Sequence, residues 1–326
     1  MNLHAETPAA IPVAIPALIS ADIDISICIC TFRRPLQLTH LLVALLAQAY
    51  DDLRIEVVVV DNDPAGSAAT VLEHWRQCSP LPLQARHEPT PNISLARNAA
   101  VHAASGAWIL FIDDDELPDP DWIRRMVATQ AQYQADAVLG PVTPNYRSDT
   151  PDWIRRGDFF NRRRLATGTR VGINDARTGN VLIRRSLLQQ LPGPFDPAFG
   201  LSGAEDTLLF HALIDLGAVL IWCDEATVSE EVASQRATLG WLLRRSYRQG
   251  QTYMRCELVR RRGAARCLRG ALLGLRALLQ CAIALVCSLL CLPLSPVKAV
   301  KWLRIGLSQC GKLSALAGHR YHEYGR

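Results

Sequence analysis

Several features that would place a protein in a familiar class are missing from this sequence. No pair of Cys-x-x-Cys units occurs among its ten cysteines, so the usual spacing of a structural zinc site is absent. The cysteines fall at irregular intervals and several lie inside apolar runs, which is typical of reduced thiols and favours a cytoplasmic compartment. The formal net charge of +4 is too small to indicate a nucleic-acid partner.

The beginning of the chain has neither the basic start nor the unbroken apolar stretch of a secretory signal. Prolines at positions 8, 12 and 16 would interrupt any apolar helix there. We therefore expect residues 1–22 to be a disordered lead-in. The rest of the 326 residues can form one large core with an appendage, which we place at 23–255 and 256–326.

Apolar strands and helical segments alternate through the first part of the chain. Ile23–Phe32 and Ile55–Val60 are continuous apolar runs, typical of strands buried on both faces of a parallel sheet. The alternation continues to a strand at Trp108–Ile112 and predicts a doubly wound parallel sheet, which binds ligands beyond the carboxyl ends of its strands. By contrast, Pro144–Thr178 has no clear periodicity and is predicted to be a long surface region. Further strands are predicted at Leu83–His87, Ala137–Pro141, Gly179–Ile183 and Ala218–Cys223.

Acidic residues follow two of these predicted strands. Asp113–Asp115 come directly after one strand, and adjacent carboxylates repel one another unless a cation lies between them. Mg²⁺ or Mn²⁺ suits such oxygen ligands and could neutralise the charge on a departing diphosphate. A solvated loop that caps the helix beginning near Asp121 is the alternative. Asp61 and Asp63 end a neighbouring strand, where an ordinary turn is the alternative.

Residues further from the acidic clusters could complete such a site. Glu205 and Asp206 open a predicted helix, where a carboxylate could take a proton from an attacking sugar hydroxyl or simply cap the helix. Arg97 interrupts a face of small residues and could bind phosphate oxygens. The predicted helix Thr238–Arg255 has a cationic side that could do the same or could be a solvated surface. Its three candidate arginines are Arg244, Arg245 and Arg248.

In this order and spacing, the segments resemble the family 2 glycosyltransferases with the GT-A fold, a doubly wound mixed α/β sheet. The resemblance covers about two thirds of the chain, from about Ile25 to Gly250. It is closer to bacterial exopolysaccharide enzymes of the succinoglycan type, which share the GAEDTLLF and RSYRQG-like stretches. The matching pieces are Thr31-Phe32-Arg33-Arg34, VVVVDND, Ser94-Leu95-Ala96-Arg97-Asn98, FIDDDE, Thr178-Gly179-Asn180, FDPAF…GAED and the arginine-rich helix.

The resemblance implies a role for each matching residue. Asp206 would be the catalytic base, and Glu205 would orient it or touch the acceptor. Asp115, with Asp113, would be the ligand of Mn²⁺ or Mg²⁺. Asp61 would bind the nucleotide base. The implied donor-binding residues are Thr31, Phe32, Arg34, Asp61, Asp63, Arg97, Asp113, Asp114, Arg244 and Arg245.

The family further implies inversion at the anomeric carbon, by a single displacement with a nucleotide-diphospho-sugar, most commonly UDP-linked. Processive members carry Gln-x-x-Arg-Trp after the acidic pair, whereas here Arg236 follows Gln235 at once and Trp241 is displaced. This departure predicts the transfer of one sugar to each acceptor. Two alternatives are a sugar-phosphate nucleotidyltransferase, which usually has a glycine-rich loop after the first strand, and a non-catalytic membrane scaffold.

The C-terminal part of the chain is predicted to associate with a membrane. Ala277–Leu294 is about long enough to cross a bilayer, and basic residues flank it on both sides. Pro293 and Pro296 suit a re-entrant or in-plane helix pair, and Lys298–Leu316 resembles an interfacial amphipathic helix. A buried hairpin is the alternative. We expect the bacterial cytoplasmic membrane, with the catalytic domain facing the cytoplasm and a lipid-linked saccharide as acceptor.

Overall fold

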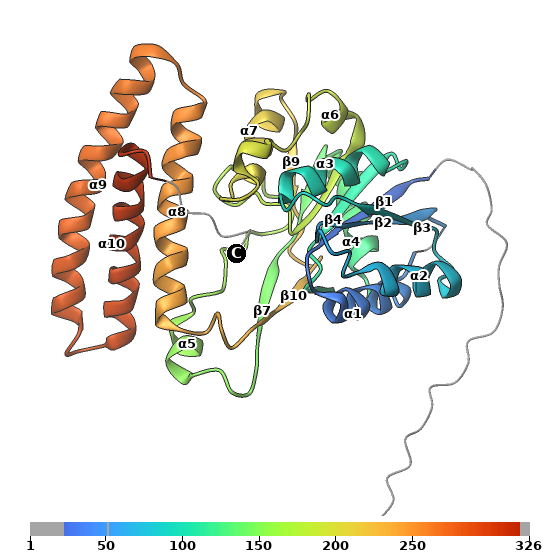
Figure 1. The fold of residues 1–326 in the computed structure, drawn as a ribbon, viewed down its shortest axis with the longest axis horizontal. Coiled ribbons are helices and arrows are strands. Elements are labelled where there is room, and N and C mark those ends of the chain that lie inside the picture. The colour runs from blue at the N-terminus through green and yellow to red at the C-terminus, as the bar shows by residue number, and fades with distance from the viewer. Residues whose placement is uncertain (1–22, 51, 320–326) are drawn as a thin grey trace, which may run out of the picture.

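The computed structural model describes residues 23–50 and 52–319, so the predicted lead-in at 1–22 lies outside the described residues. A seven-stranded sheet forms the centre of the protein, and four of its strands, β3-β2-β1-β4, are parallel (Figure 1). β8 runs antiparallel to β4 and β6, so the sheet is mixed, as the family resemblance implies. Neighbouring parallel strands need a long crossover, usually a helix. The chain enters β8 through an irregular connection instead, so β8 can run antiparallel. The strands are β3 (Leu83–His87), β2 (Ile55–Asp61), β1 (Ile25–Thr31), β4 (Trp108–Ile112), β8 (Asn180–Arg184), β6 (Ala137–Leu139) and β9 (Leu220–Trp222).

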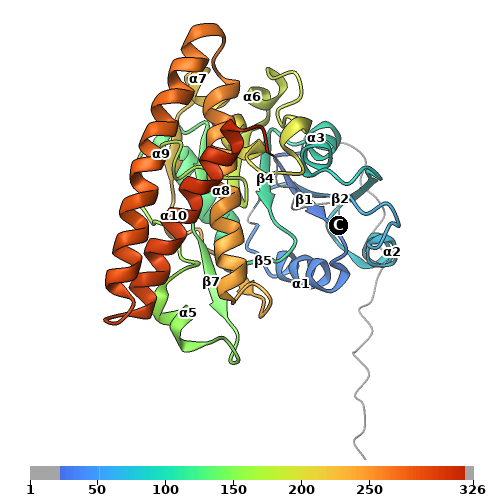
Figure 2. The same cartoon turned by 60° about the vertical axis from the view of Figure 1, so that its left-hand side comes forward.

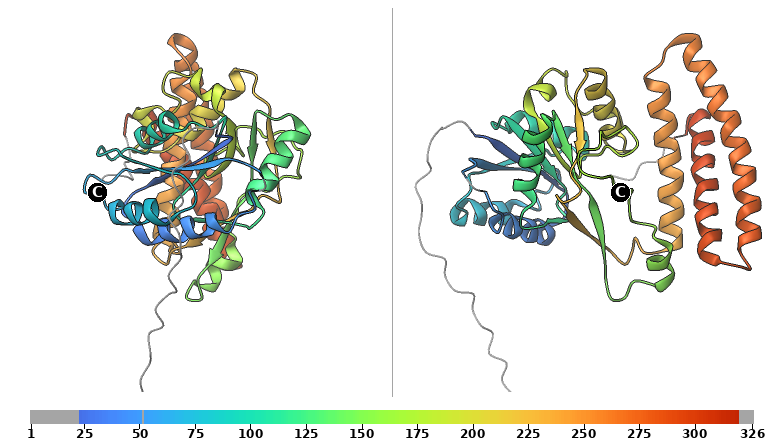
Figure 3. Two further views of the ribbon diagram at one scale, coloured as in Figure 1. Left: turned by 90° about the vertical axis from the view of Figure 1, so that its right-hand side faces the viewer. Right: turned by 180° about the vertical axis from the view of Figure 1, so that it is seen from behind.

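Helices cover both faces of this sheet (Figure 3). Successive side chains of a strand point to opposite faces, so Ile27 of β1 joins the core beneath α1, α2 and α4, whereas Cys28 joins the core beneath α3, α6 and α7. Because both faces of the sheet are covered, a ligand can reach it only at the edge where the strands end. The helices are α1 (Pro35–Leu46), α2 (Ala69–Cys78), α3 (Ile93–Ala103), α4 (Trp122–Tyr133), α6 (Arg185–Gln189) and α7 (Glu205–Asp215), with a short 3-10 turn at Pro197–Phe199.

A second, three-stranded sheet lies beside the first and was not predicted. It consists of β5 (Glu116–Pro118), β10 (Val228–Val232) and β7 (Val142–Tyr146), in that order. The region 144–178 is therefore partly ordered, since β7 enters it, α5 (Asp152–Gly157) follows, and Ile154 and Phe159 are buried. Pro144 lies inside β7, and since proline is rare in strands, the sequence pattern did not predict this strand.

Three long helices follow the sheets and pack side by side, with α10 (Pro296–Leu316) between α8 (Leu239–Val259) and α9 (Gly263–Cys291) (Figure 2). Glycines bring α8 and α10 together. A Cβ on Gly250 would lie 1.8 Å from the carbonyl oxygen of Ser308, and a Cβ on Gly311 would lie 2.0 Å from that of Tyr247. The two backbones are therefore in direct contact, and the predicted domain boundary between residues 255 and 256 falls within α8.

A buried carboxylate ties the N-terminal strands together and gives a first testable prediction. Glu56 of β2 is 3% exposed and accepts hydrogen bonds from Ser26 Oγ, from the amide and hydroxyl of Ser105, and from Gln84 Nε2 at 2.5–2.7 Å. Burial raises the pKa of Glu56, but these hydrogen bonds outweigh burial and lower it overall.

Glu56→Gln is expected to lower the free energy of unfolding at neutral pH by about 1–3 kcal/mol, because an amide cannot accept all of these bonds. A depressed folded pKa stabilises the protein above the unfolded pKa, and the stabilisation is lost as pH falls through the folded pKa. The difference between Glu56→Gln and wild type should therefore shrink in acid. Urea unfolding across the acidic range measures this, and a constant difference would contradict it.

Candidate active site

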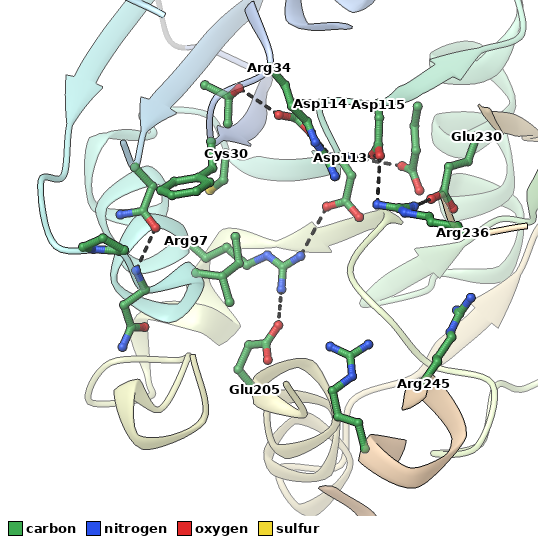
Figure 4. Close-up of a pocket in the computed structure, with 18 of the residues that line it drawn as sticks. Cys30, Arg34, Arg97, Asp113, Asp114, Asp115, Glu205, Glu230, Arg236 and Arg245 are labelled. Atoms are coloured by element: carbon green, nitrogen blue, oxygen red, sulfur yellow. Dashed lines mark hydrogen bonds and ion pairs between the residues drawn. The ribbon is translucent and has the colours of Figure 1, made fainter. Parts of the chain in front are cut away.

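A cavity of about 400 Å³ opens where β1, β2 and β4 end (Figure 4). This is the edge that the order of strands predicts for ligand binding. Residues of α7, α8 and the small sheet form its other walls. The sequence-predicted residues that line it are Thr31, Phe32, Arg34, Arg97, Asp113, Asp114, Asp115, Glu205 and Arg245.

The three adjacent aspartates after β4 have different surroundings. Asp114 is buried and accepts hydrogen bonds from Thr31 Oγ1 and Arg34 Nη1, both at 2.8 Å, so its carboxylate is held by the end of β1. The Asp115 carboxylate lies 2.8 Å from the same Arg34 nitrogen. Asp113 is the most open of the three, with 48% of its side chain exposed, and its carboxylate lies 3.3 Å from Arg97 Nη2.

A fourth carboxylate, Glu116, lies buried beside these aspartates. Its Oε2 accepts a hydrogen bond from the amide of Asp113 at 3.1 Å. A Cβ on residue 179 would come within 2.8 Å of Glu116 Oε1, so Gly179 of the Thr178-Gly179-Asn180 motif makes room for this side chain. Burial raises the pKa of Glu116 well above its usual value, and the negative charge of Asp113 raises it further. The pKa of Asp115 rises to about 7, chiefly through burial and against the opposing charge of Arg34.

Arg97 of α3 connects the aspartates to the start of α7. Its guanidinium is buried and forms an ion pair with Glu205 Oε1 at 2.6 Å, in addition to the contact with Asp113. Burial and the neighbouring charge of Asp206 raise the pKa of Glu205 to about 7, although Arg97 opposes the rise. Glu205 Oε2 is also buried and has no hydrogen-bond partner among residues 23–50 and 52–319.

Cationic side chains form a further part of the cavity wall. Arg245 of α8 lies over the ring of Trp241, 5.0 Å from its centroid, and burial together with neighbouring Arg162 lowers its pKa to about 10. Arg236 makes ion pairs with Glu230 of β10 and with Asp115, 3.6 Å away. An anion entering the cavity would reduce the repulsion between these cations. Arg162, Arg236, Arg245 and Arg248 all line the cavity.

Four sequence-predicted residues do not line the cavity. The buried Asp61 carboxylate accepts hydrogen bonds from the amides of Asp63 and Ala68, which holds the turn after β2. Asp63 lies against Arg33. Arg244 lies on the exposed side of α8. Asp206 is next to Glu205, but its carboxylate accepts from the amide and hydroxyl of Thr207.

Other residues line the cavity without having been predicted. Asn62, which follows β2, lines the cavity, whereas its neighbours Asp61 and Asp63 do not. Glu230 comes from β10, a strand that no sequence pattern indicated. Glu116 could have been suspected, because it directly follows the three aspartates. Arg162 lies in the segment predicted to be surface and gave no periodic signal.

The donor atoms at the ends of β4 and β5 fit a divalent cation whose remaining ligands come from a nucleotide and water. Among the residues that the structure describes, no three His, Cys, Asp or Glu side chains converge as a complete protein metal site. Mg²⁺ commonly needs only one or two protein carboxylates when phosphates are also present. Burial is the main cause of the raised pKa values of Asp115 and Glu116, and repulsion from neighbouring carboxylates, which a cation would relieve, raises both values further.

Fold and site together define a GT-A transferase, and comparison with known proteins gives the family. Residues 26–191 match the model of "Glycosyl transferase family 2", about half of the chain. The succinoglycan biosynthesis protein ExoM of Rhizobium meliloti is 35% identical over 297 residues, which cover 91% of this chain and 94% of that protein. The chain therefore belongs to glycosyl transferase family 2 and is a glycosyltransferase, as the sequence resemblance predicted.

More distant relatives and solved structures agree with this family. The glucosyl-dolichyl phosphate glucuronosyltransferase of Haloferax volcanii is 24% identical over 69% of this chain and 75% of that protein. The mannosyltransferase PcManGT of Pyrobaculum calidifontis, solved with GDP-Man and Mn²⁺, superposes with a TM-score of 0.61 at 19% identity, covering 92% of this chain and 89% of that one. S. aureus TarS 1-349 with UDP-GlcNAc gives 0.53 at 18% identity, covering 92% and 93%. These likenesses show the GT-A fold.

Proposed function

We propose that this glycosyltransferase moves one sugar from a nucleotide-diphospho-sugar to a lipid-linked or polysaccharide-precursor acceptor at the cytoplasmic face of a bacterial membrane. The observation that carries the proposal is the shared cavity itself. It brings the acidic end of β4, buried Arg97, the Glu205 carboxylate and the arginines of α8 together at the ligand-binding edge of the sheet.

The donor would bind along the end of the parallel strands. Thr31 and Phe32 offer a wall for the nucleoside, and Asp114, held by Thr31 and Arg34, or the more open Asp113 could contact the ribose. Asp113 and Asp115 would hold Mn²⁺ or Mg²⁺, which neutralises charge on the diphosphate when bound. Arg97 and Arg245, at opposite sides of the cavity, supply fixed positive charge for the same phosphate oxygens.

The proton of the attacking hydroxyl would go to the acidic pair at the start of α7. We assign Asp206 as the base on the family match, since Glu205 is already paired with Arg97 at 2.6 Å. Glu205 is a second candidate because its Oε2 lies buried at the cavity wall without a partner in the described chain and its pKa of about 7 suits proton transfer at neutral pH. Direct attack on the anomeric carbon, without an enzyme-bound sugar, would invert its configuration.

Several finer features rest on different support. A UDP-linked donor is supported by the fold shared with TarS, whose structure contains UDP-GlcNAc. A precursor of an exopolysaccharide as acceptor is supported by ExoM, a protein of succinoglycan biosynthesis. Transfer of a single sugar is supported by the displaced Gln235, Arg236 and Trp241, of which Arg236 pairs with Glu230 and Asp115.

The proposal predicts that the purified full chain binds one nucleotide-sugar from a panel and hydrolyses it slowly, and that EDTA abolishes both effects. Mn²⁺ or Mg²⁺ should restore them, because the cation supplies the positive charge that lets an acidic cavity bind a negatively charged diphosphate. Calorimetric binding and release of free nucleotide provide the measurements. Donor binding and turnover that persist unchanged in EDTA would refute metal dependence, and products extended by many sugars would refute single transfer.

A further inference from the structure

The outer side of α9 is an apolar surface that the rest of the described chain leaves uncovered. Leu275, Leu279 and Leu290 are 69%, 62% and 67% exposed. α9 is also the one helix among the described residues that is long and apolar enough to cross a membrane by length and composition. In both Figure 1 and Figure 2 it is the outermost helix of the three, on the side away from the α/β domain. We call this surface the α9 outer face, made up of Leu268, Leu272, Leu275, Leu278, Leu279, Ile283, Leu285, Val286, Leu289, Leu290, Leu292 and Leu294.

The charged residues within the sequence of α9 and α10 all have one sign. Residues 258–319, which include α9 and α10, carry ten lysines and arginines and no aspartate or glutamate. Arg262 and Arg266 lie at the N-terminal end of the helix and Arg276 lies near its middle, while Lys298 and Lys301 lie just beyond its C-terminal end. Basic groups at both ends of an apolar helix complement a surface of anionic lipid headgroups.

Packing within the helical unit prevents α9 from leaving the other two helices to cross a bilayer. Along its length α9 contacts α10, from Gly274 against Leu316, through Cys281 with its Sγ 3.6 Å from that of Cys310, to Ser288, whose hydroxyl donates to Ala299 O at 3.0 Å. A membrane-spanning α9 would carry α10 to the same depth.

Burying α10 at that depth would be costly for two reasons. It carries Lys298, Lys301, Arg304 and Lys312, and charged side chains at the centre of a bilayer are expensive. It is also fixed to α8 by the backbone contacts at Gly250 and Gly311, and α8 is in turn bonded to the α/β domain, through Thr252 Oγ1 to Ser202 O at 3.2 Å. Only the outward side of α9 can reach hydrocarbon while these contacts persist.

We propose that the α9 outer face docks in the plane of an anionic membrane surface, with its leucines inserted about 5–10 Å and its basic ends at the headgroups. The helix therefore lies on the membrane and does not span it. The proposal specifies the membrane contact of the proposed function but is independent of the donor, the metal and the base. Its tests use the intact protein and read out binding to lipid, so failure here leaves the proposed reaction untouched.

Vesicle binding tests the docking face directly. The full chain is expected to co-sediment with vesicles of equimolar phosphatidylcholine and phosphatidylglycerol, and to bind less at high salt and to phosphatidylcholine alone. The double variant Leu275→Asp/Leu279→Asp should lower partitioning into the vesicles by at least about tenfold, because the transfer of two leucine side chains from water into lipid no longer contributes to binding. The matched control Val43→Asp/Leu216→Asp changes residues that are 55% and 46% exposed on α1 and after α7, and should bind like wild type. Equal binding by all three proteins, or none by wild type, would overturn the proposal.

Protease accessibility separates lying from spanning. Trypsin added outside sealed vesicles that carry bound protein should cleave at both ends of α9, at the exposed Arg262 and Lys298, without detergent and as it does in the lipid-free protein. Cleavage at one of these ends with protection of the other until detergent is added would show that α9 spans the membrane. Sedimentation equilibrium without lipid tests whether a second copy of the chain covers this face instead. A dimer that Leu275→Asp/Leu279→Asp dissociates, together with no vesicle binding by wild type, would assign the face to that second copy.

Discussion

Replacing Asp206 with asparagine is expected to lower kcat by about 10²–10⁴-fold while donor affinity stays close to that of wild type. This is the usual contribution of a positioned general base, and the amide cannot accept the proton of the acceptor hydroxyl. Asp206 does not line the donor cavity, and its carboxylate bonds only within its own turn in the described structure, to Thr207. Its loss should therefore leave the donor pocket intact. Turnover with donor and acceptor, alongside nucleotide-sugar binding by calorimetry, gives both quantities.

Glu205→Gln is the informative comparison for that variant. If Glu205 only positions Arg97 and the acceptor, the glutamine should weaken turnover less than Asp206→Asn and should also reduce donor affinity, because a neutral amide holds Arg97 less firmly than the carboxylate that lies 2.6 Å from it. The reverse pattern, near-normal turnover in Asp206→Asn and loss in Glu205→Gln, would move the role of base to Glu205. The unpartnered Oε2 of Glu205 makes this a real alternative for the described structure.

Arg97→Met should have the largest effect on stability. It leaves the buried Glu205 carboxylate without its cation, and removal of one partner from a buried ion pair typically lowers the free energy of unfolding by about 3–5 kcal/mol. Donor affinity should fall as well, since Arg97 is the buried cation beside Asp113. Urea unfolding in EDTA isolates the protein's own contribution from that of a metal.

The pH dependence of that loss has a defined sign. Burial and Asp206 raise the pKa of Glu205 to about 7, and removing Arg97 raises it further. A carboxyl whose folded pKa lies above its unfolded pKa loses stability as pH rises between the two values. The difference between Arg97→Met and wild type should therefore widen as pH rises through about 7. Adding Glu205→Gln to Arg97→Met should recover part of the loss, and a double variant no more stable than Arg97→Met would contradict the pairing.

Much of the central sheet could be predicted because its strands are buried on both faces and read as apolar runs. The predicted strand Ile23–Phe32 contains β1, and Ile55–Val60 is β2 without its last residue. The small sheet was missed because β10, with sequence VSEEV, is short and half polar, and β7 contains Pro144. Long-range pairing stabilises such strands, and local sequence does not encode it.

The candidate site divides in the same way. Asp113–Asp115 and Arg97 could be found because their position at a strand end or on a small-residue helix face is a local signal. Asp61 had the same local signal, yet its carboxylate turns back to two amides of its own loop. Side-chain direction after a strand depends on the turn that follows, which residue type alone does not specify. Glu230 could be placed in the cavity only once β10 was known to pair with β5.

α8 lines the cavity on one side and packs against α10 on the other, which limits how far the chain can be shortened. One side of α8 presents Arg245 and Arg248 to the cavity, while Gly250 meets the backbone of α10 and the hydroxyl of Ser246 accepts a hydrogen bond from Arg304. A chain shortened to end after α8 would expose that second side to water and lose the support of one wall of the reaction chamber. We therefore expect the smallest autonomous catalytic unit to extend through α10, because continuous packing joins the wall of the cavity to α10 and α9.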